Sequence, residues 1–307
     1  MDAQILNDIL SVFTGSIDGA IAVLVGIGLS LFGILALISY YQRYATTVLY
    51  RGGLGDALAS FLLILCGIGA GYWLMLHLVE LTDALYQTFL TWGGTGGGFT
   101  GAQMLNPGVI VDTGFRLARP IRTFTDNLIG WMALWDWPTM LIYSLSYYVI
   151  VASFFFLAAH LLFVIVEFKL SVLAACVLVP CGIWSPTAFL AEAGVGWLAG
   201  SVVRVFLTAV LMGLAFPLFT RVTFTVSSGG DPTFFSALLC GFVSIMFAIL
   251  AWQVPARAAG LVGRGLALSG FQLAEAAATG ARFVLAGAGA VQGVLQGTSR
   301  LVAQMRG

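Results

Sequence analysis

Charge is the scarcest property of this 307-residue chain. Only 8% of its residues are charged, whereas 60% are hydrophobic, and an ordinary soluble domain carries roughly 25% charged residues. Thirteen basic residues are balanced by thirteen acidic ones, so the chain has no surplus of positive charge with which to hold nucleic-acid phosphates. The composition predicts a membrane protein and argues against direct, sequence-specific binding of nucleic acid.

The sequence also lacks the motifs of catalysis and of metal binding. Its four cysteines lie in apolar stretches without CxxC spacing, so we expect small buried side chains rather than zinc ligands. We interpret His77 and His160 as core residues in the same way. No Ser/His/Asp order, carboxylate pair or nucleotide-binding loop is present. We therefore expect neither an enzyme nor a cofactor, although a bound phospholipid remains compatible with the sequence.

Long apolar runs are what the chain does contain. A helix needs about 20 apolar residues to cross ~30 Å of hydrocarbon. Five runs meet this requirement: Gly19–Ser39, Ala57–Val79, Met140–Val166, Gly196–Phe219 and Phe234–Ala251. A sixth candidate, Leu170–Leu190, is interrupted by Pro180, Gly182 and Pro186. The predicted fold is an all-α, polytopic transmembrane bundle with five crossings plus a proline-broken element, or with six crossings.

The distribution of positive charge predicts the topology of these spans. The first 42 residues contain no lysine or arginine and three aspartates, unlike a cleavable signal peptide, so we expect a retained span there. Arg43 and Arg51 follow the first span. The tail carries five further arginines: Arg257, Arg264, Arg282, Arg300 and Arg306. Positive segments stay in the cytoplasm, so the N-terminus is predicted to be periplasmic and the C-terminus cytoplasmic.

An odd number of crossings follows from that topology, which makes Leu170–Leu190 a re-entrant or half-helix element. Glu167 and the single lysine, Lys169, would then mark the cytoplasmic turn before it. The alternative is an ordinary kinked sixth span. Arg204 lies near the middle of its own span, where a cation costs roughly 2.5–3.5 kcal/mol to insert. It either lines an inter-subunit, pore-facing or lipid-phosphate site, or pairs within the bundle with Glu167 or Glu192.

A less hydrophobic region separates the second and third strong spans. Glycines at Gly93–Gly98 predict a flexible joint. The next stretch repeats apolar residues at helical spacing, with charges on other faces. It is predicted to lie at the membrane–water boundary with its arginines toward lipid phosphates or a partner, or else to pack on its own bundle. The residues assigned to this region are Arg116, Arg119, Arg122, Trp131, Trp135 and Trp137.

The tail is rich in alanine and glycine. Gly289, Gly293 and Gly297 form a GxxxGxxxG pattern, which allows helix backbones to approach closely. We predict an oligomer contact here, with disorder as the alternative because glycine is a poor helix former. The chain then divides into two N-terminal spans (1–91), the joint and amphipathic region (92–138), the membrane bundle (139–254) and the tail (255–307).

Several motifs in one order resemble a known family. These are "YYVIVASFFFLAAHLLFVIVEFKLS", "VLVPCGIWSPTAFLAE", "GVGWLAGSVVRVFLTAVLMGLAF" with one buried cation, and "WQVPARAAGLVGRG" before an Ala/Gly tail. From Tyr147 to Ala278 this order is similar to the TrbL-type proteins of bacterial type IV secretion and conjugation machines.

The resemblance implies an inner-membrane structural and conduit component. It implies a ring-like homo-oligomer, contacts with membrane lipids, assembly ATPases, a minor pilin and pilin, and a role in pilus assembly and substrate passage. The alternative is a secondary transporter, because a broken helix near a buried charge also suits a substrate site at mid-membrane.

Overall fold

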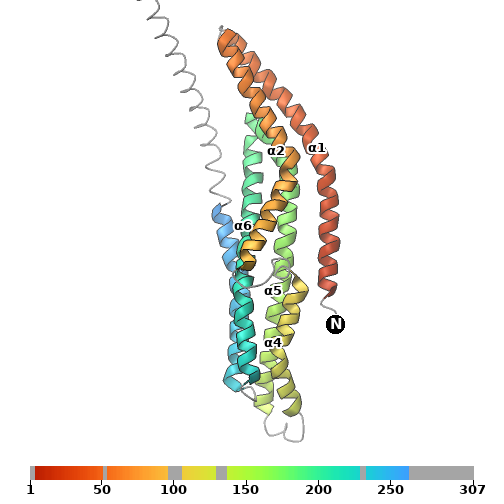
Figure 1. The fold of residues 1–307 in the computed structure, drawn as a ribbon, viewed down its shortest axis with the longest axis vertical. Coiled ribbons are helices and arrows are strands. Elements are labelled where there is room, and N and C mark those ends of the chain that lie inside the picture. The colour runs from red at the N-terminus through yellow and green to blue at the C-terminus, as the bar shows by residue number, and fades with distance from the viewer. Residues whose placement is uncertain (1–3, 51–53, 96–105, 129–136, 229–232, 263–307) are drawn as a thin grey trace, which may run out of the picture.

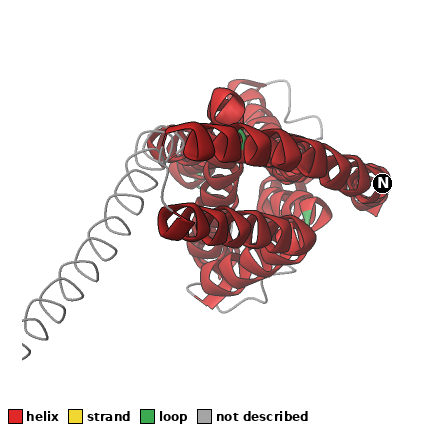
Figure 2. Ribbon diagram, turned by 90° about the horizontal axis from the view of Figure 1, so that it is seen from above, coloured by secondary structure: helices red, strands yellow, loops and turns green. Residues whose placement is uncertain are grey.

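The computed structural model describes residues 4–50, 54–95, 106–128, 137–228 and 233–262, and these residues are almost entirely helical (Figures 1 and 2). No strand occurs in these ranges. The labelled helices are α1 (Gln4–Tyr50), α2 (Leu54–Thr95), α4 (Pro107–Leu128), α5 (Trp137–Leu178) and α6 (Ala188–Ser228). A further helix, Phe234–Val262, follows α6 and is called the last described helix below.

Five helical stretches in these ranges are long and apolar enough to cross a membrane. They are Ile5–Gln42, Leu65–Gly93, Trp137–Ile183, Ser185–Phe219 and Phe234–Val262. The predicted all-α, polytopic fold is confirmed. The helices are longer than the apolar runs suggested: α5 has 42 residues, and at 1.5 Å per residue it measures about 63 Å.

The proline-broken stretch is the turn of a helical hairpin. α5 passes through Glu167 and Lys169 without interruption, and the chain reverses only at two short 3₁₀ helices, η2 (Val179–Ile183) and η3 (Ser185–Thr187). Pro180 and Pro186 lie in their first turns, where a missing backbone N–H leaves no hydrogen bond unmade. The Thr187 hydroxyl donates to the Cys181 carbonyl at 2.8 Å and closes the turn.

The predicted turn at Glu167 and Lys169 is therefore wrong, and so is a separate re-entrant element at Leu170–Leu190. That stretch consists of the end of α5, the turn and the start of α6. The physical reason is that both charges find partners on neighbouring helices, so the helix does not have to end at these residues and α5 can continue.

The hairpin of α5 and α6 runs along most of the molecule, and the other helices pack against its two halves (Figure 1). α1 and α2 pack near the hairpin turn, where the Trp184 indole donates to the Gln42 side chain at 2.9 Å. α4 packs along the first half of α5, and the last described helix contacts the middle of α5, where Trp252 meets Phe156 with ring centroids 5.7 Å apart.

Close approach of the helices depends on a few glycines. A Cβ on Gly93 would lie 2.7 Å from the Ala209 Cβ, so α2 can approach α6 this closely at Gly93 only because the position is glycine. Gly93 thus belongs to α2, which continues to Thr95, and not to a flexible joint. Gly28 on α1 faces the Cys176 carbonyl in the same way.

The core is mostly apolar, and a small polar contact joins α5 and α6 within it. Phe168 is fully buried and stacks on Tyr86 of α2 at 5.0 Å between ring centroids. Next to it, the buried Ser171 and Ser201 hydroxyls are 2.6 Å apart and share a hydrogen bond. Such a bond across two helices contributes roughly 0.6–2 kcal/mol in a membrane protein. The contact fixes the register of the hairpin beside Glu167 and Lys169.

α4 packs lengthwise on α5. Phe124 contacts Tyr143, and Phe115, nine residues earlier, contacts Phe155, so the two helices are antiparallel. The apolar face expected from the sequence is buried, including Ile110, Leu117 and Ile121. Of the two predicted arrangements, the structure has the amphipathic helix packed on its own bundle.

Candidate functional site: charged residues at one level of the bundle

Arg204 and Glu167 form an ion pair between α6 and α5. Their side chains are only 22% and 17% exposed. Of the two carboxylates considered as partners of Arg204, the structure selects Glu167. The pair is largely shielded from solvent, so removing one member leaves the other charge poorly compensated.

Lys169 makes a second set of ion pairs on the opposite side of α5. A separation of two residues turns a side chain by about 200° around a helix, so Lys169 faces away from α6. Its ammonium lies 2.9 Å from an oxygen of Asp18 on α1 and 3.5 Å from an oxygen of Asp83 on α2. The lysine is 18% exposed and each aspartate 51%. Sequence reasoning missed both aspartates.

These five residues form what we call the charge layer: Asp18, Asp83, Glu167, Lys169 and Arg204. It contains three carboxylates and two cations, and it links α1, α2, α5 and α6 at one level. The half-exposed aspartates are screened by solvent, so their pairs contribute about 0–1 kcal/mol each. The more deeply placed Arg204–Glu167 pair contributes more to holding the helices in register.

Two buried nitrogens near the charge layer have no hydrogen-bond partner in the described part of the chain. They are Arg204 Nε and His160 Nε2. Two polar atoms near the charge layer, one on α5 and one on α6, are therefore buried without a hydrogen bond to the described residues.

A polar cleft of about 490 Å³ opens beside Lys169, between the start of α1, the end of α2 and the start of α4. Its neutral polar lining includes Asn7, Thr14, Gln87 and Asn106. The Asn7 side chain accepts a hydrogen bond from the backbone N–H of Gly108 at 3.2 Å, which connects α1 to α4. The cleft gives Asp18 and Lys169 access to solvent.

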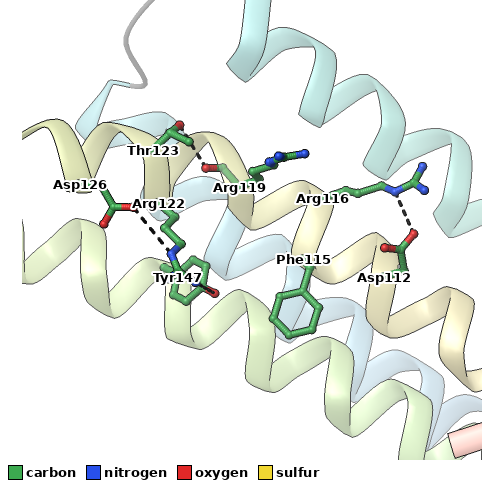
Figure 3. Close-up of a pocket in the computed structure, with 8 residues that line it drawn as sticks. All are labelled: Asp112, Phe115, Arg116, Arg119, Arg122, Thr123, Asp126 and Tyr147. Atoms are coloured by element: carbon green, nitrogen blue, oxygen red, sulfur yellow. Dashed lines mark hydrogen bonds and ion pairs between the residues drawn. The ribbon is translucent and has the colours of Figure 1, made fainter. Parts of the chain in front are cut away.

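The arginines predicted to face lipid or a partner lie together on the exposed side of α4. Arg116, Arg119 and Arg122 line one groove (Figure 3). The Arg122 guanidinium donates to the Tyr147 hydroxyl, and this hydrogen bond is the main cause that raises the pKa of Arg122 above its usual value.

The remaining predicted residues are distributed as follows. Trp137 begins α5 and is exposed, whereas Trp131, Trp135, Gly289, Gly293 and Gly297 lie outside the described residues. The expectation that all four cysteines are buried is wrong for Cys66, which is exposed, and for Cys181, which is half-buried in the hairpin turn. His77 stacks on Trp73, one turn before it on α2.

The long apolar helices and the charge layer define a polytopic α-helical membrane protein. The sequence model of the TrbL/VirB6 plasmid conjugal transfer proteins matches residues 44–254, more than half of the chain. The chain thus belongs to the TrbL/VirB6 family, as the motifs indicated, and is a component of a type IV secretion system for conjugal transfer. No curated protein matches it. The match contains every residue of the charge layer except Asp18.

Proposed function

We propose that this protein is an inner-membrane structural and conduit component of its conjugation machine, which supports pilus assembly and substrate passage as a ring-like oligomer. Family membership supports the machine, and the five apolar helices support the membrane. The charge layer carries the structural part of the proposal. Ion pairs that link four helices at one level favour a scaffold that keeps its shape.

The secondary transporter, the alternative function, loses its main support. A transporter of that kind needs broken helices around a substrate site near the middle of the membrane. The prolines that suggested such a helix, Pro180 and Pro186, lie instead in the hairpin turn between the end of α5 and the start of α6. No other observation favours a substrate site.

Partners and orientation complete the proposal. The chain sits in the bacterial inner membrane with its N-terminus in the periplasm and its C-terminus in the cytoplasm, as the arginine distribution favours. It contacts membrane lipids, the assembly ATPases, the minor pilin and the pilin of the same machine. Copies associate in part through the tail, where Gly289, Gly293 and Gly297 allow close contact between helices.

Deletion and complementation test this function. A donor strain that lacks the gene should lose both conjugative transfer and pili, and the wild-type gene should restore them. Protein extracted in mild detergent should migrate as a large oligomer, and Gly293→Ile should release smaller species while Gly293→Ala should not. Normal transfer by the deletion strain would exclude the proposed role, and a wild-type monomer would exclude the ring.

A further inference from the structure

α4 presents a short row of charged side chains along its exposed side, with negative charges at the two ends and positive charges between them. Asp112 and Asp126 stand at the two ends, and three arginines stand between them (Figure 3). These residues line an open groove of about 770 Å³ together with Phe115, Thr123 and Tyr147. The row holds three positive charges and two negative ones, so its centre is cationic.

The side of α4 that faces outward is fixed by its packing. Gly114 lies directly against Phe154 of α5, and a Cβ at that position would overlap the phenylalanine ring. Ile121 and Ala118 are fully buried against the bundle. Rotation of α4 about its axis would expose these residues and bury the arginines without partners, so the arginines face away from the bundle.

The outer arginines are already paired, and the central one is not. Arg116 Nε lies 2.8 Å from an Asp112 oxygen. Arg122 Nε lies 3.8 Å from an Asp126 oxygen, and its guanidinium is 5.7 Å from the centre of the Tyr147 ring. Arg119 has no ion pair in the described part of the chain. Its guanidinium, with five N–H donors, is available for a carboxylate or a phosphate.

The charges of the row and its direction argue against hydrocarbon, lipid headgroups and nucleic acid as the ligand. Hydrocarbon cannot cover five charged side chains. Lipid headgroups lie in one plane, but α4 is antiparallel to α5, so its arginines are stacked along the direction in which α5 crosses the membrane. A continuous nucleic-acid backbone would meet an aspartate at both ends of the row.

We propose that this groove binds a short acidic segment of another protein. From Arg116 to Arg122 the helix rises about 9 Å, and from Asp112 to Asp126 about 21 Å. Two or three carboxylates on one face of a partner helix fit the distance between Arg116 and Arg122. The aspartates at the two ends of the row would repel a longer acidic segment. Phe115 and Tyr147 supply an aromatic floor for one apolar residue between the carboxylates.

Binding of a designed peptide tests this proposal. The full-length protein is placed in nanodiscs of phosphatidylcholine, and the probe is a fluorescent helical peptide with three glutamates one turn apart and one leucine between them. We expect saturable binding at physiological salt that weakens at least tenfold in Arg119→Glu and less in Arg119→Lys. The matched control is Arg257→Glu, an exposed arginine on the last described helix, which should bind like the wild type.

Phosphatidylglycerol vesicles and a 15-residue oligothymidylate are tested in parallel. No peptide binding by the wild type, or an equal loss in Arg257→Glu, would overturn the proposal. Tighter binding of vesicles or oligonucleotide that depends on Arg119 would also overturn it and would assign the groove to lipid or nucleic acid. Oligomer size is measured separately on the same samples, so a failure to bind the peptide can be distinguished from a failure to form the ring.

Discussion

Arg204 lies among apolar side chains and depends on a single carboxylate for its charge balance. Arg204→Lys keeps a cation near Glu167, so we expect partial conjugative transfer. Arg204→Leu leaves Glu167 unpaired, and we expect transfer to fall to background. The double variant Arg204→Leu, Glu167→Gln removes both charges and should recover thermal stability. Transfer frequency and melting temperature are measured for all three variants.

These variants separate two roles of Arg204. If the double variant also recovers transfer, the pair serves stability alone. If it is stable but does not transfer, the charge of Arg204 is needed for function. Full transfer by Arg204→Leu would contradict both roles.

Lys169 gives a second prediction at the scale of single residues. Lys169→Met leaves Asp18 and Asp83 facing each other without a cation, and their repulsion should loosen α1 and α2. The aspartates are half-exposed, so we expect a loss on the order of 1 kcal/mol, seen as a lower melting temperature in detergent. Adding Asp18→Asn and Asp83→Asn should reverse most of it, and a triple variant no more stable than Lys169→Met would refute this account.

Among the helices, contacts at glycine allow a matched comparison. Gly93→Val forces a side chain into Ala209 of α6, whereas Gly26→Val on α1 meets nothing within 4 Å. Overpacking a tight contact typically costs 1–3 kcal/mol, and the change in helix propensity is the same for both variants. Only Gly93→Val should lower the melting temperature. Equal effects would show that Gly93 does not lie against Ala209.

The helices themselves were largely predictable from the sequence, and their partners were not. A run of about 20 apolar residues identifies a span without any knowledge of its neighbours, so all five spans were found. The interruption by Glu167 and Lys169 was misread because Arg204, Asp18 and Asp83 lie far from them in the chain. Ion pairing between distant helices removes the need for a turn, and no local pattern in α5 reveals it.

α4 illustrates the same limit. Its apolar residues predicted an amphipathic helix correctly, because helical spacing is a local property. Whether that face meets lipid or protein depends on the partner surface. The contact of Gly114 with Phe154 brings α4 against α5, and neither residue alone indicates this pairing.

On the scale of the whole molecule, topology can be tested directly. Reporter fusions at Asp8 and Gly307 should report opposite compartments, with the N-terminus in the periplasm, because arginines are absent before Arg43 and frequent after Trp252. Fusions that report the same compartment would show that the number of crossings is even.

The helices are too long for a bilayer alone to cover their apolar surface. α5 and α6 have 42 and 41 residues, about twice the length needed to cross ~30 Å of hydrocarbon. Exposed apolar residues occur near both ends of α5, for example Leu141 and Leu170. A bilayer covers only part of this surface. The rest needs protein neighbours, which is the situation of a subunit inside a larger machine.

The charge layer also limits how the protein can move. If one helix slid past another by a single turn, it would travel 5.4 Å, and the ion pairs that cross that helix contact would separate. Axial sliding of α1, α2 or α6 against α5 is therefore blocked, and these four helices respond to an external force as one stiff unit. In the conduit proposed above, a passage for cargo that opens and closes is then expected between copies of the chain rather than among these four helices.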